Sequence, residues 1–318
     1  MAWRFGSRAA TLAMLCLAAC SLDGITSTAE SFNWKAGTAS HALTVGLRTR
    51  SYLVHVPPKR PTSGGVATSW PLVIVLHGSS GVGKSIEEMS AMDALADSAL
   101  FLVAYPDGSA GDFGLFPTDW NAGTCCGGAN RDNVDDLAFI AELVKQTATH
   151  VSVNSKKVYV AGFSAGARMA YHVGCQLSAT VAAVAVVSGS LVDDRCTPAL
   201  PMPLIAMHGT DDPVVAYDEG APPLHGVAPA TADALPPSVR YWTALYTCTG
   251  GTRTPTTQHV TQTRFTKCTS GTDIDFYSID GGTHGWPGGP VDPGSVPPMS
   301  EIRASFLIWQ FFARHTHK

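Results

Sequence analysis

The sequence is poor in charge and has no basic run. Charged residues make up 14% of its 318 residues, against roughly 25% in an average soluble domain. Hydrophobic residues make up 45%, and the formal net charge is −4. Nucleic-acid-binding proteins normally carry a stripe of Lys and Arg side chains, so this composition argues against that class.

The sequence also lacks an apolar run of the roughly 18 to 20 residues that a membrane span requires. Its N-terminal apolar run, residues 9–19, follows Arg4 and Arg8, an order typical of an export signal. The run ends in Leu-Ala-Ala before Cys20, which resembles a bacterial lipobox, whose cysteine is acylated after cleavage. We therefore expect an exported protein, either a cell-envelope lipoprotein or, alternatively, a secreted protein without lipid. Any membrane association is expected only through the lipid on Cys20.

This interpretation divides the chain into three parts. Residues 1–19 are the predicted lipoprotein signal peptide, and residues 20–40, rich in Ser, Thr, Ala and Gly, form a flexible tether after acylated Cys20. Residues 41–318 form one folded domain. No internal repeat and no second domain is evident.

The cysteines lack the Cys-x-x-Cys spacing of common metal sites. Six remain after Cys20, and an even number in an exported chain favours disulfides. Cys175 ends a predicted helix and Cys196 lies in the loop after the next strand, so we expect them to pair. Cys248 and Cys268 are expected to pair across a loop that leads into a later strand. Two adjacent cysteines, Cys125 and Cys126, are either joined to each other or free.

Strand-like and helix-like segments alternate along the chain. A continuous apolar run such as residues 71–76 is typical of a strand buried on both faces. The other predicted strands cover 51–56, 100–105, 157–161, 181–187, 203–207 and 274–279. Predicted helices cover 86–98, a segment capped by Asn133, 165–176 and 302–312. This alternation predicts an α/β fold with a mostly parallel sheet covered by helices on both faces.

A candidate nucleophile lies between one of these strands and a helix. Residues 162–166 read Gly-Phe-Ser-Ala-Gly, and G-x-S-x-G in that context is typical of a nucleophile elbow. The small flanking residues allow a sharp turn that exposes the hydroxyl of Ser164. The backbone N–H of Ala165, at the helix start, is then one candidate donor of an oxyanion hole.

A serine nucleophile needs a base, and the base needs an orienting acid. Asp212 follows the strand 203–207 and His284 follows the strand 274–279, in the chain order that such sites use. We predict Ser164, Asp212 and His284 as a catalytic triad. A second oxyanion donor is expected from the backbone N–H of Ser79, in the loop after residues 71–76. His77 is expected to organise that loop.

One motif favours a different function. Residues 78–85 fit G-x-x-x-x-G-K-S between a strand and a helix, the pattern of a phosphate-binding loop. An exported chain meets little nucleoside triphosphate, and the apolar strand 102–105 runs into Pro106 before Asp107, so no clean magnesium ligand follows. A nucleotide binder therefore stays a remote alternative, as does a non-catalytic, lipid-anchored binding module.

The motifs together resemble one known family. They comprise the elbow, Tyr-Pro-Asp-Gly at 105–108, Trp-Asn-Ala-Gly at 120–123 with Cys-Cys-Gly at 125–127, His-Gly-Thr-Asp-Asp at 208–212, and Gly-Gly-Thr-His-Gly-Trp at 281–286. From about residue 42 to 315 the chain is similar to secreted α/β-hydrolase esterases. That family includes poly(3-hydroxybutyrate) depolymerases, feruloyl and acetylxylan esterases, and LpqC-type lipoproteins.

The resemblance implies the α/β-hydrolase fold and a serine esterase that needs no metal or organic cofactor. It places the nucleophile at Ser164, the base at His284 and the acid at Asp212 rather than Asp211. The implied substrate is an ester, either a hydroxyalkanoate oligomer or polymer, or a feruloylated or acetylated polysaccharide. Trp120 and Trp286 are candidate walls of the substrate pocket, with a place in the core as the alternative.

Overall fold

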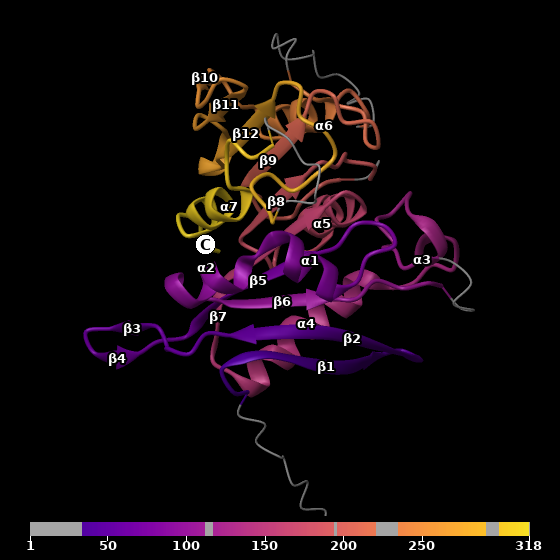
Figure 1. Ribbon diagram of the computed structural model, residues 1–318, viewed down its shortest axis with the longest axis vertical. Coiled ribbons are helices and arrows are strands. Elements are labelled where there is room, and N and C mark those ends of the chain that lie inside the picture. Colours follow the sequence, from indigo (N-terminus) through magenta and orange to yellow (C-terminus); the bar gives the residue numbers. More distant parts are fainter. Residues whose placement is uncertain (1–33, 112–116, 194–195, 221–234, 291–298, 318) are drawn as a thin grey trace, which may run out of the picture. The chain divides into compact units, whose positions relative to one another are not determined.

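The computed structural model describes residues 34–111, 117–193, 196–220, 235–290 and 299–317. The predicted signal peptide and the acylation site Cys20 lie outside these residues. The described chain is built on one ten-stranded sheet and a separate two-stranded hairpin (Figure 1). Its central strands β6, β5, β7, β8, β9 and β12 run parallel to one another.

The sheet has the order β1-β2-β6-β5-β7-β8-β9-β12-β11-β10. Antiparallel strands close it at both edges, through β1 and β2 at one and β11 and β10 at the other. The strands are β1 (Gly37–Val45), β2 (Arg48–Val56), β5 (Trp70–Leu76), β6 (Leu102–Pro106), β7 (Val153–Phe163), β8 (Ala183–Val187), β9 (Leu204–Gly209), β10 (Thr252–Pro255), β11 (Val260–Phe265) and β12 (Ile274–Ile279). The hairpin is β3 (Thr62–Ser63) and β4 (Val66–Ala67).

Helices cover both faces of the sheet. One face carries α1 (Gly83–Ser90), α2 (Met92–Ala99) and α7 (Ala304–Phe312), and the other carries α4 (Asp136–His150), α5 (Ala165–Gln176) and α6 (Pro237–Leu245). A short helix, α3 (Gly127–Arg131), follows the Cys125-Cys126 pair. Within the described ranges, no helix has both the length and the apolarity needed to cross a bilayer.

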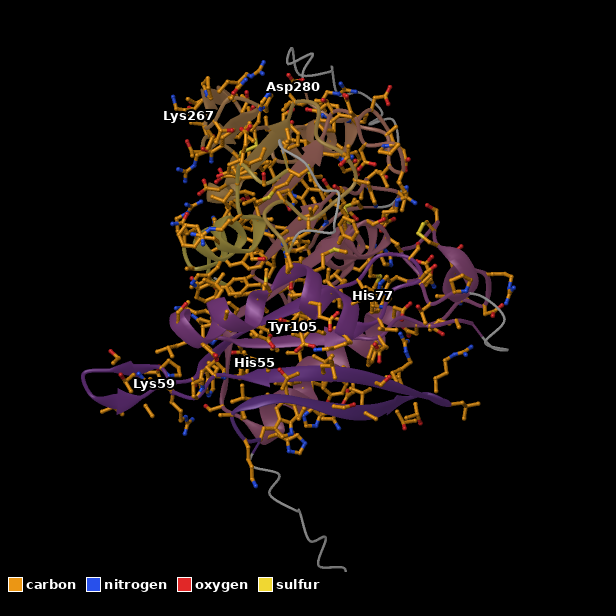
Figure 2. All side chains as sticks on the ribbon, in the orientation of Figure 1. His55, Lys59, His77, Tyr105, Lys267 and Asp280 are labelled. Atoms are coloured by element: carbon orange, nitrogen blue, oxygen red, sulfur yellow. A yellow bond between two sulfur atoms is a disulfide. The ribbon has the colours of Figure 1, made fainter. Side chains whose placement is uncertain are left out.

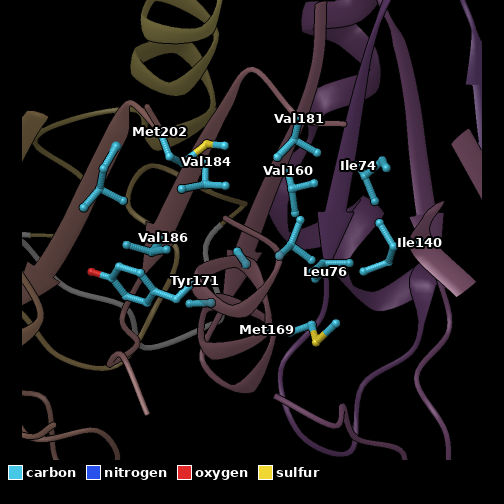
Figure 3. Packing of buried hydrophobic residues seen from close by; sticks show 14 of the residues in the cluster. Ile74, Leu76, Ile140, Val160, Met169, Tyr171, Val181, Val184, Val186 and Met202 are labelled. Carbon is cyan, nitrogen blue, oxygen red and sulfur yellow. The ribbon is translucent and has the colours of Figure 1, made fainter. Parts of the chain in front are cut away.

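Alternation along the central strands divides the core in two. In β5, Leu72, Ile74 and Leu76 belong to the core under α4, α5 and α6, while Val73 and Val75 belong to the core under α1, α2 and α7. Successive side chains of a strand point to opposite faces, so a strand covered on both sides is apolar throughout. Figure 3 shows the first of these cores, with Ile74 and Leu76 near Ile140 of α4.

The structure corrects several sequence-based boundaries. The tether was predicted to reach residue 40, but Gly37–Val45 pairs with β2 along its whole length. The predicted helix 86–98 is two helices, because Ala91 has the left-handed φ of 47° and ends α1. The cap of α4 is Asp135, which accepts from Ala138 N–H at 2.8 Å, rather than Asn133.

The parallel strands bring the candidate residues to one edge of the sheet. The loops after β5, β7, β8, β9 and β12 all leave from carboxyl ends, which lie side by side in a parallel sheet. Ligand sites of open α/β sheets form outside these ends.

Candidate active site

Ser164 occupies a sharp turn between β7 and α5. Its backbone has φ 56° and ψ −118°, a conformation that is strained for a residue with a side chain. Its amide donates to Val187 O at 3.0 Å, which ties the turn to the neighbouring strand β8. The turn has the strand-to-helix context that the nucleophile-elbow motif requires.

The two glycines of the motif are required by close backbone approach. A Cβ on Gly162 would lie 2.0 Å from Gly166 O, and a Cβ on Gly166 would lie 2.3 Å from Leu76 O. Real Cβ atoms essentially never approach backbone atoms so closely. The elbow therefore packs directly against the end of β5.

Asp212 and His284 contact each other across adjacent loops. Nδ1 of His284 lies 2.8 Å from Oδ2 and 3.0 Å from Oδ1 of Asp212. The imidazole packs beside the elbow, with its ring centroid 4.8 Å from that of Phe163. Asp211 is exposed and its Oδ1 accepts from Thr210 instead. The geometry thus joins His284 to Asp212, the carboxylate selected from the sequence.

The Asp212 carboxylate is buried yet stays ionised. Burial alone raises its pKa, but hydrogen bonds from His208 and His284 and from the amides of Val215 and Val214 lower it more. The net effect holds the pKa of Asp212 well below its usual range. An anion beside Nδ1 of His284 fixes the imidazole tautomer and leaves Nε2 as an acceptor.

The loop after β5 lies directly against the nucleophile. A Cβ on Gly78 would lie 3.1 Å from Ser164 Cβ, so the backbone just before Ser79 lies against the nucleophile. The Ser79 hydroxyl donates to Asp119 Oδ2 at 2.8 Å, and Ser80 N–H donates to Thr118 O at 2.8 Å. These bonds fix the loop that was predicted to hold one oxyanion donor.

Ala165 is the first residue of α5. The first amides of a helix have no carbonyl one turn back to accept their hydrogen, so its N–H is available at the elbow.

His77 organises this loop, as predicted. Figure 2 labels its side chain. Its Nε2 accepts from Gly108 N–H at 2.8 Å, so its Nδ1 carries the proton and donates to Gly78 O at 2.7 Å. Burial lowers the pKa of His77, which favours this neutral form. The His77 carbonyl in turn accepts from Trp120 Nε1 at 2.9 Å.

Trp120 and Trp286 both lie in the core, which was the alternative to a place in the pocket wall. Trp120 has 0% exposed surface and supports the His77 backbone from below. Trp286 is 6% exposed, packs in the α7 core and donates to Ser305 Oγ at 3.0 Å. Each indole N–H donates a hydrogen bond within the protein, as is usual for a buried tryptophan.

Residues of the phosphate-loop pattern at 78–85 bind other groups of the protein instead. Gly83 N–H, at the start of α1, donates to the Asp107 carboxylate at 2.6 Å, where a phosphate would need that donor. Lys84 is exposed and pairs with Glu87 at 2.9 Å. A carboxylate at this helix start repels phosphate, so the geometry argues against the nucleotide-binding alternative.

Both predicted long-range disulfides occur. Cys175 is bonded to Cys196 with Cα atoms 4.8 Å apart, and Cys248 to Cys268 with Cα atoms 4.0 Å apart. Cys125 and Cys126 form a vicinal disulfide, the alternative that the sequence left open. Among the described residues, no group of three or more His, Cys, Asp or Glu side chains could hold a metal ion.

Some residues around the site were not found from the sequence. Asp119 anchors the Ser79 loop, and Arg168 of α5 contacts both the vicinal disulfide and Glu219. Asp119 precedes the Trp-Asn-Ala-Gly motif directly, which was the available signal. Arg168 had no signal, because its partners come from loops that only the fold brings together.

The parallel sheet, the strand-to-helix serine turn and the Asp–His pair define an α/β-hydrolase. Residues 50–222, more than half of the chain, match the family described as esterase PHB depolymerase. The chain belongs to this family.

Curated relatives agree with this class. Feruloyl esterase B of Piromyces equi is 32% identical over 221 residues, which cover 67% of this chain. The chain spans only 39% of that relative's length. The putative esterase NocK of Nocardia uniformis is 29% identical over 283 residues, covering 82% of this chain and 78% of the relative.

Solved structures share the fold. An acetyl xylan esterase from Aspergillus awamori has a TM-score of 0.56 at 15% identity, covering 84% of this chain and 99% of its own. A ferulic acid esterase from Anaeromyces mucronatus has a TM-score of 0.55 at 15% identity, covering 88% and 90%. The predicted α/β-hydrolase fold is confirmed. The family match and the 32% identical relative place the chain in the family of these esterases.

Proposed function

We propose that the protein is a serine esterase that works through an acyl-enzyme. The observation that carries this proposal is the hydrogen bond between His284 Nδ1 and the ionised Asp212, beside the strained turn that holds Ser164. The three residues follow strands β7, β9 and β12 in the order that α/β-hydrolases use.

Each residue has one role in this mechanism. His284 Nε2 takes the proton of Ser164 as the hydroxyl attacks the ester carbonyl, and Asp212 stabilises the imidazolium that forms. The amides of Ala165 and Ser79 donate to the oxyanion. His284 then protonates the leaving alcohol, and water, activated by the same imidazole, releases the acid from Ser164.

Loss of the nucleophile tests this proposal. We expect Ser164→Ala to lower kcat for p-nitrophenyl butyrate by about four to six orders of magnitude while the unfolding midpoint stays close to that of the wild type. A fluorophosphonate should add once to the wild type and not to the variant, by intact mass. Activity of the variant within tenfold of the wild type would refute the triad.

As substrate we propose a hydroxyalkanoate polyester or its oligomers, because the match to the PHB depolymerase family runs from within β2 to the loop after β9. Plant cell-wall esters are the second candidate, since a relative 32% identical to this chain is named a feruloyl esterase. Release of 3-hydroxybutyrate from the polyester and of ferulate from feruloylated arabinoxylan, at equal enzyme concentration, distinguishes the two. A rate on the polyester below that on the feruloyl ester would reverse this ranking.

We also propose that the chain is exported and anchored through acylated Cys20. The Leu-Ala-Ala-Cys sequence after an apolar run supports the anchor, and the disulfides support an oxidising compartment. A mature N-terminus at Cys20 carrying lipid, seen by intact mass, would agree with this. A mature N-terminus elsewhere without lipid would refute it.

A further inference from the structure

Arg168 lies one helical turn from the proposed nucleophile. Its amide donates to Ser164 O at 3.1 Å, the same oxygen that accepts from Ala167 N–H at 3.0 Å. Side chains of a helix lean towards its N-terminus, and residues four apart share a face, so the Arg168 side chain lies towards Ser164. One helical turn rises about 5.4 Å along the axis, a distance that a substrate covers with a few covalent bonds.

Two other loops meet the Arg168 guanidinium, and a third joins them through Glu219. Its Nη2 donates to Glu219 Oε1, in the loop that also carries Asp212, and its Nη1 lies 3.4 Å from Cys125 Sγ. Ser190, in the loop after β8, donates its hydroxyl to the same Glu219 oxygen at 2.8 Å. The loops after β6, β8 and β9 thus converge on one polar cluster beside the elbow. We call Arg168, Ser190 and Glu219 the polar subsite.

The next polar residues on α5 already have hydrogen-bond partners within the protein. His172, one turn further on, lies 2.7 Å from Asp193 through Nδ1, and Gln176 donates to the same carboxylate at 3.2 Å. The side chains of His172 and Asp193 are only 12% and 4% exposed. These groups hold the loop after β8 onto the helix, which is a structural role.

The polar subsite is open by comparison. The side chains of Arg168 and Glu219 are 20% and 36% exposed, whereas the buried structural pair Arg50–Asp136 is 6% and 0% exposed. Within the described part of the chain, no hydrogen bond reaches Glu219 Oε2, and Arg168 Nε is buried without an acceptor. The second oxygen of a carboxylate that is 36% exposed is therefore available to a ligand.

The chemistry of the subsite selects its ligand. A carboxylate and a guanidinium side by side offer an acceptor and donors with no net charge. An anionic ligand would be repelled by Glu219, and an apolar one would leave both charges unsolvated. A neutral hydroxyl group satisfies both, because it donates to Glu219 Oε2 and accepts from Arg168.

We propose that Arg168 and Glu219 bind a hydroxyl group of the substrate and thereby determine which esters the protein prefers. This inference rests on the proposed function, because the preference is expressed at Ser164. The hydroxyl belongs either to the alcohol side of the ester or to the acyl side, as in a 3-hydroxy acid.

Two matched substrate pairs separate these sources. 1-Monobutyrin and propyl butyrate share an acyl group and a three-carbon alcohol, and differ by two hydroxyls on the alcohol side. Methyl 3-hydroxybutyrate and methyl butyrate differ by one hydroxyl on the acyl side. The quantity measured is the ratio of kcat/KM for the hydroxylated ester to that for its plain partner.

The variants are Arg168→Met, which keeps the apolar stem and removes the donors, and Glu219→Gln, which keeps the shape. Both should lower the ratio of one pair by about tenfold, the effect of one hydrogen bond to a charged group. Arg264→Met is the matched control, since Arg264 also pairs with an acid, Asp275 at 3.2 Å, but does so at the start of β12, away from the site. It should leave both ratios unchanged.

The proposal is overturned if the wild type prefers the hydroxylated ester in neither pair. It is also overturned if the variants lose activity equally on both members of each pair, as a purely structural role predicts. If Arg168→Met does not fold, Glu219→Gln gives the same measurement. The proposed function has its own test: it fails if the Ser164→Ala variant stays active. That result does not depend on the ratios of kcat/KM measured here.

Discussion

Two adjacent carboxylates, Asp211 and Asp212, occupy different environments at the end of β9. Asp212 is buried and contacts His284, while the side chain of Asp211 is exposed and accepts a hydrogen bond from Thr210. We expect Asp212→Asn to lower kcat by about 10⁴, because the amide favours the wrong imidazole tautomer. Asp211→Asn is the matched control and should change kcat by about threefold or less, as for other surface substitutions. Steady-state kinetics on p-nitrophenyl butyrate measures both, and equal losses would contradict the assignment.

The low pKa of Asp212 also has a consequence for stability. Its pKa is lower in the folded state than in the unfolded state, so the unfolded chain binds its proton more readily. The stabilisation is therefore complete above the unfolded-state pKa of about 4 and is lost as the pH falls below it. We expect the difference in free energy of unfolding between the wild type and Asp212→Asn to be larger at pH 7 than at pH 3. Urea unfolding at both pH values measures it, and a pH-independent difference would disagree with this account.

For single residues, the sequence predicted a role correctly where a local motif fixes the residue's neighbours. Asp212 and His284 each follow a strand, so strand order alone brought them together. The sequence left the place of Trp120 open, because an aromatic residue beside a motif suits a pocket wall and a buried support equally well. Only the hydrogen bond from Trp120 Nε1 to His77 O distinguishes a buried support from a pocket wall.

Among the elements, the turn between β7 and α5 is the most constrained. Gly166→Ala would place a Cβ 2.3 Å from Leu76 O and 2.5 Å from His77 O, so β5 and its loop must move away from the nucleophile. We expect activity to fall by about a hundredfold or more, since such displacements of a catalytic group are that costly. Gly174→Ala on the same helix is the control, because its Cβ would meet the Val184 side chain at 3.3 Å. It should keep activity within about threefold, and equal loss in both variants would indicate a general effect on α5.

Element prediction succeeded where burial dictates the pattern. The strand 274–279 and the helix 165–176 match β12 and α5 residue for residue, because each carries an uninterrupted apolar face. The edge strands β10 and β11 were missed, since their polar residues alternate or are wholly exposed. The phosphate-loop pattern misled for the opposite reason, because a glycine-rich strand-to-helix turn also suits a helix start capped by Asp107.

Across the whole molecule, two disulfides close loops of nearly equal length at different depths. The bridge Cys175–Cys196 spans 21 positions and lies in the core, where its cysteines are 3% and 0% exposed. The bridge Cys248–Cys268 spans 20 positions and is only partly buried at the edge of that core. Loop-closure entropy is set by loop length, so it assigns both bridges the same contribution, about 3 kcal/mol.

Removing each bridge separates the entropic contribution from packing. We expect Cys248→Ala/Cys268→Ala to lower the free energy of unfolding by about 3 kcal/mol, as the chain-entropy account requires. Cys175→Ala/Cys196→Ala should cost about 1 to 3 kcal/mol more, because it also leaves a cavity in the closely packed core under α5 and α6. Urea unfolding of both double variants measures the difference, with the wild type in excess reductant as the control for loss of the bridges without loss of sulfur. Equal destabilisation of the two variants would mean that the core relaxes around the missing sulfurs, and that loop closure alone accounts for what the disulfides contribute.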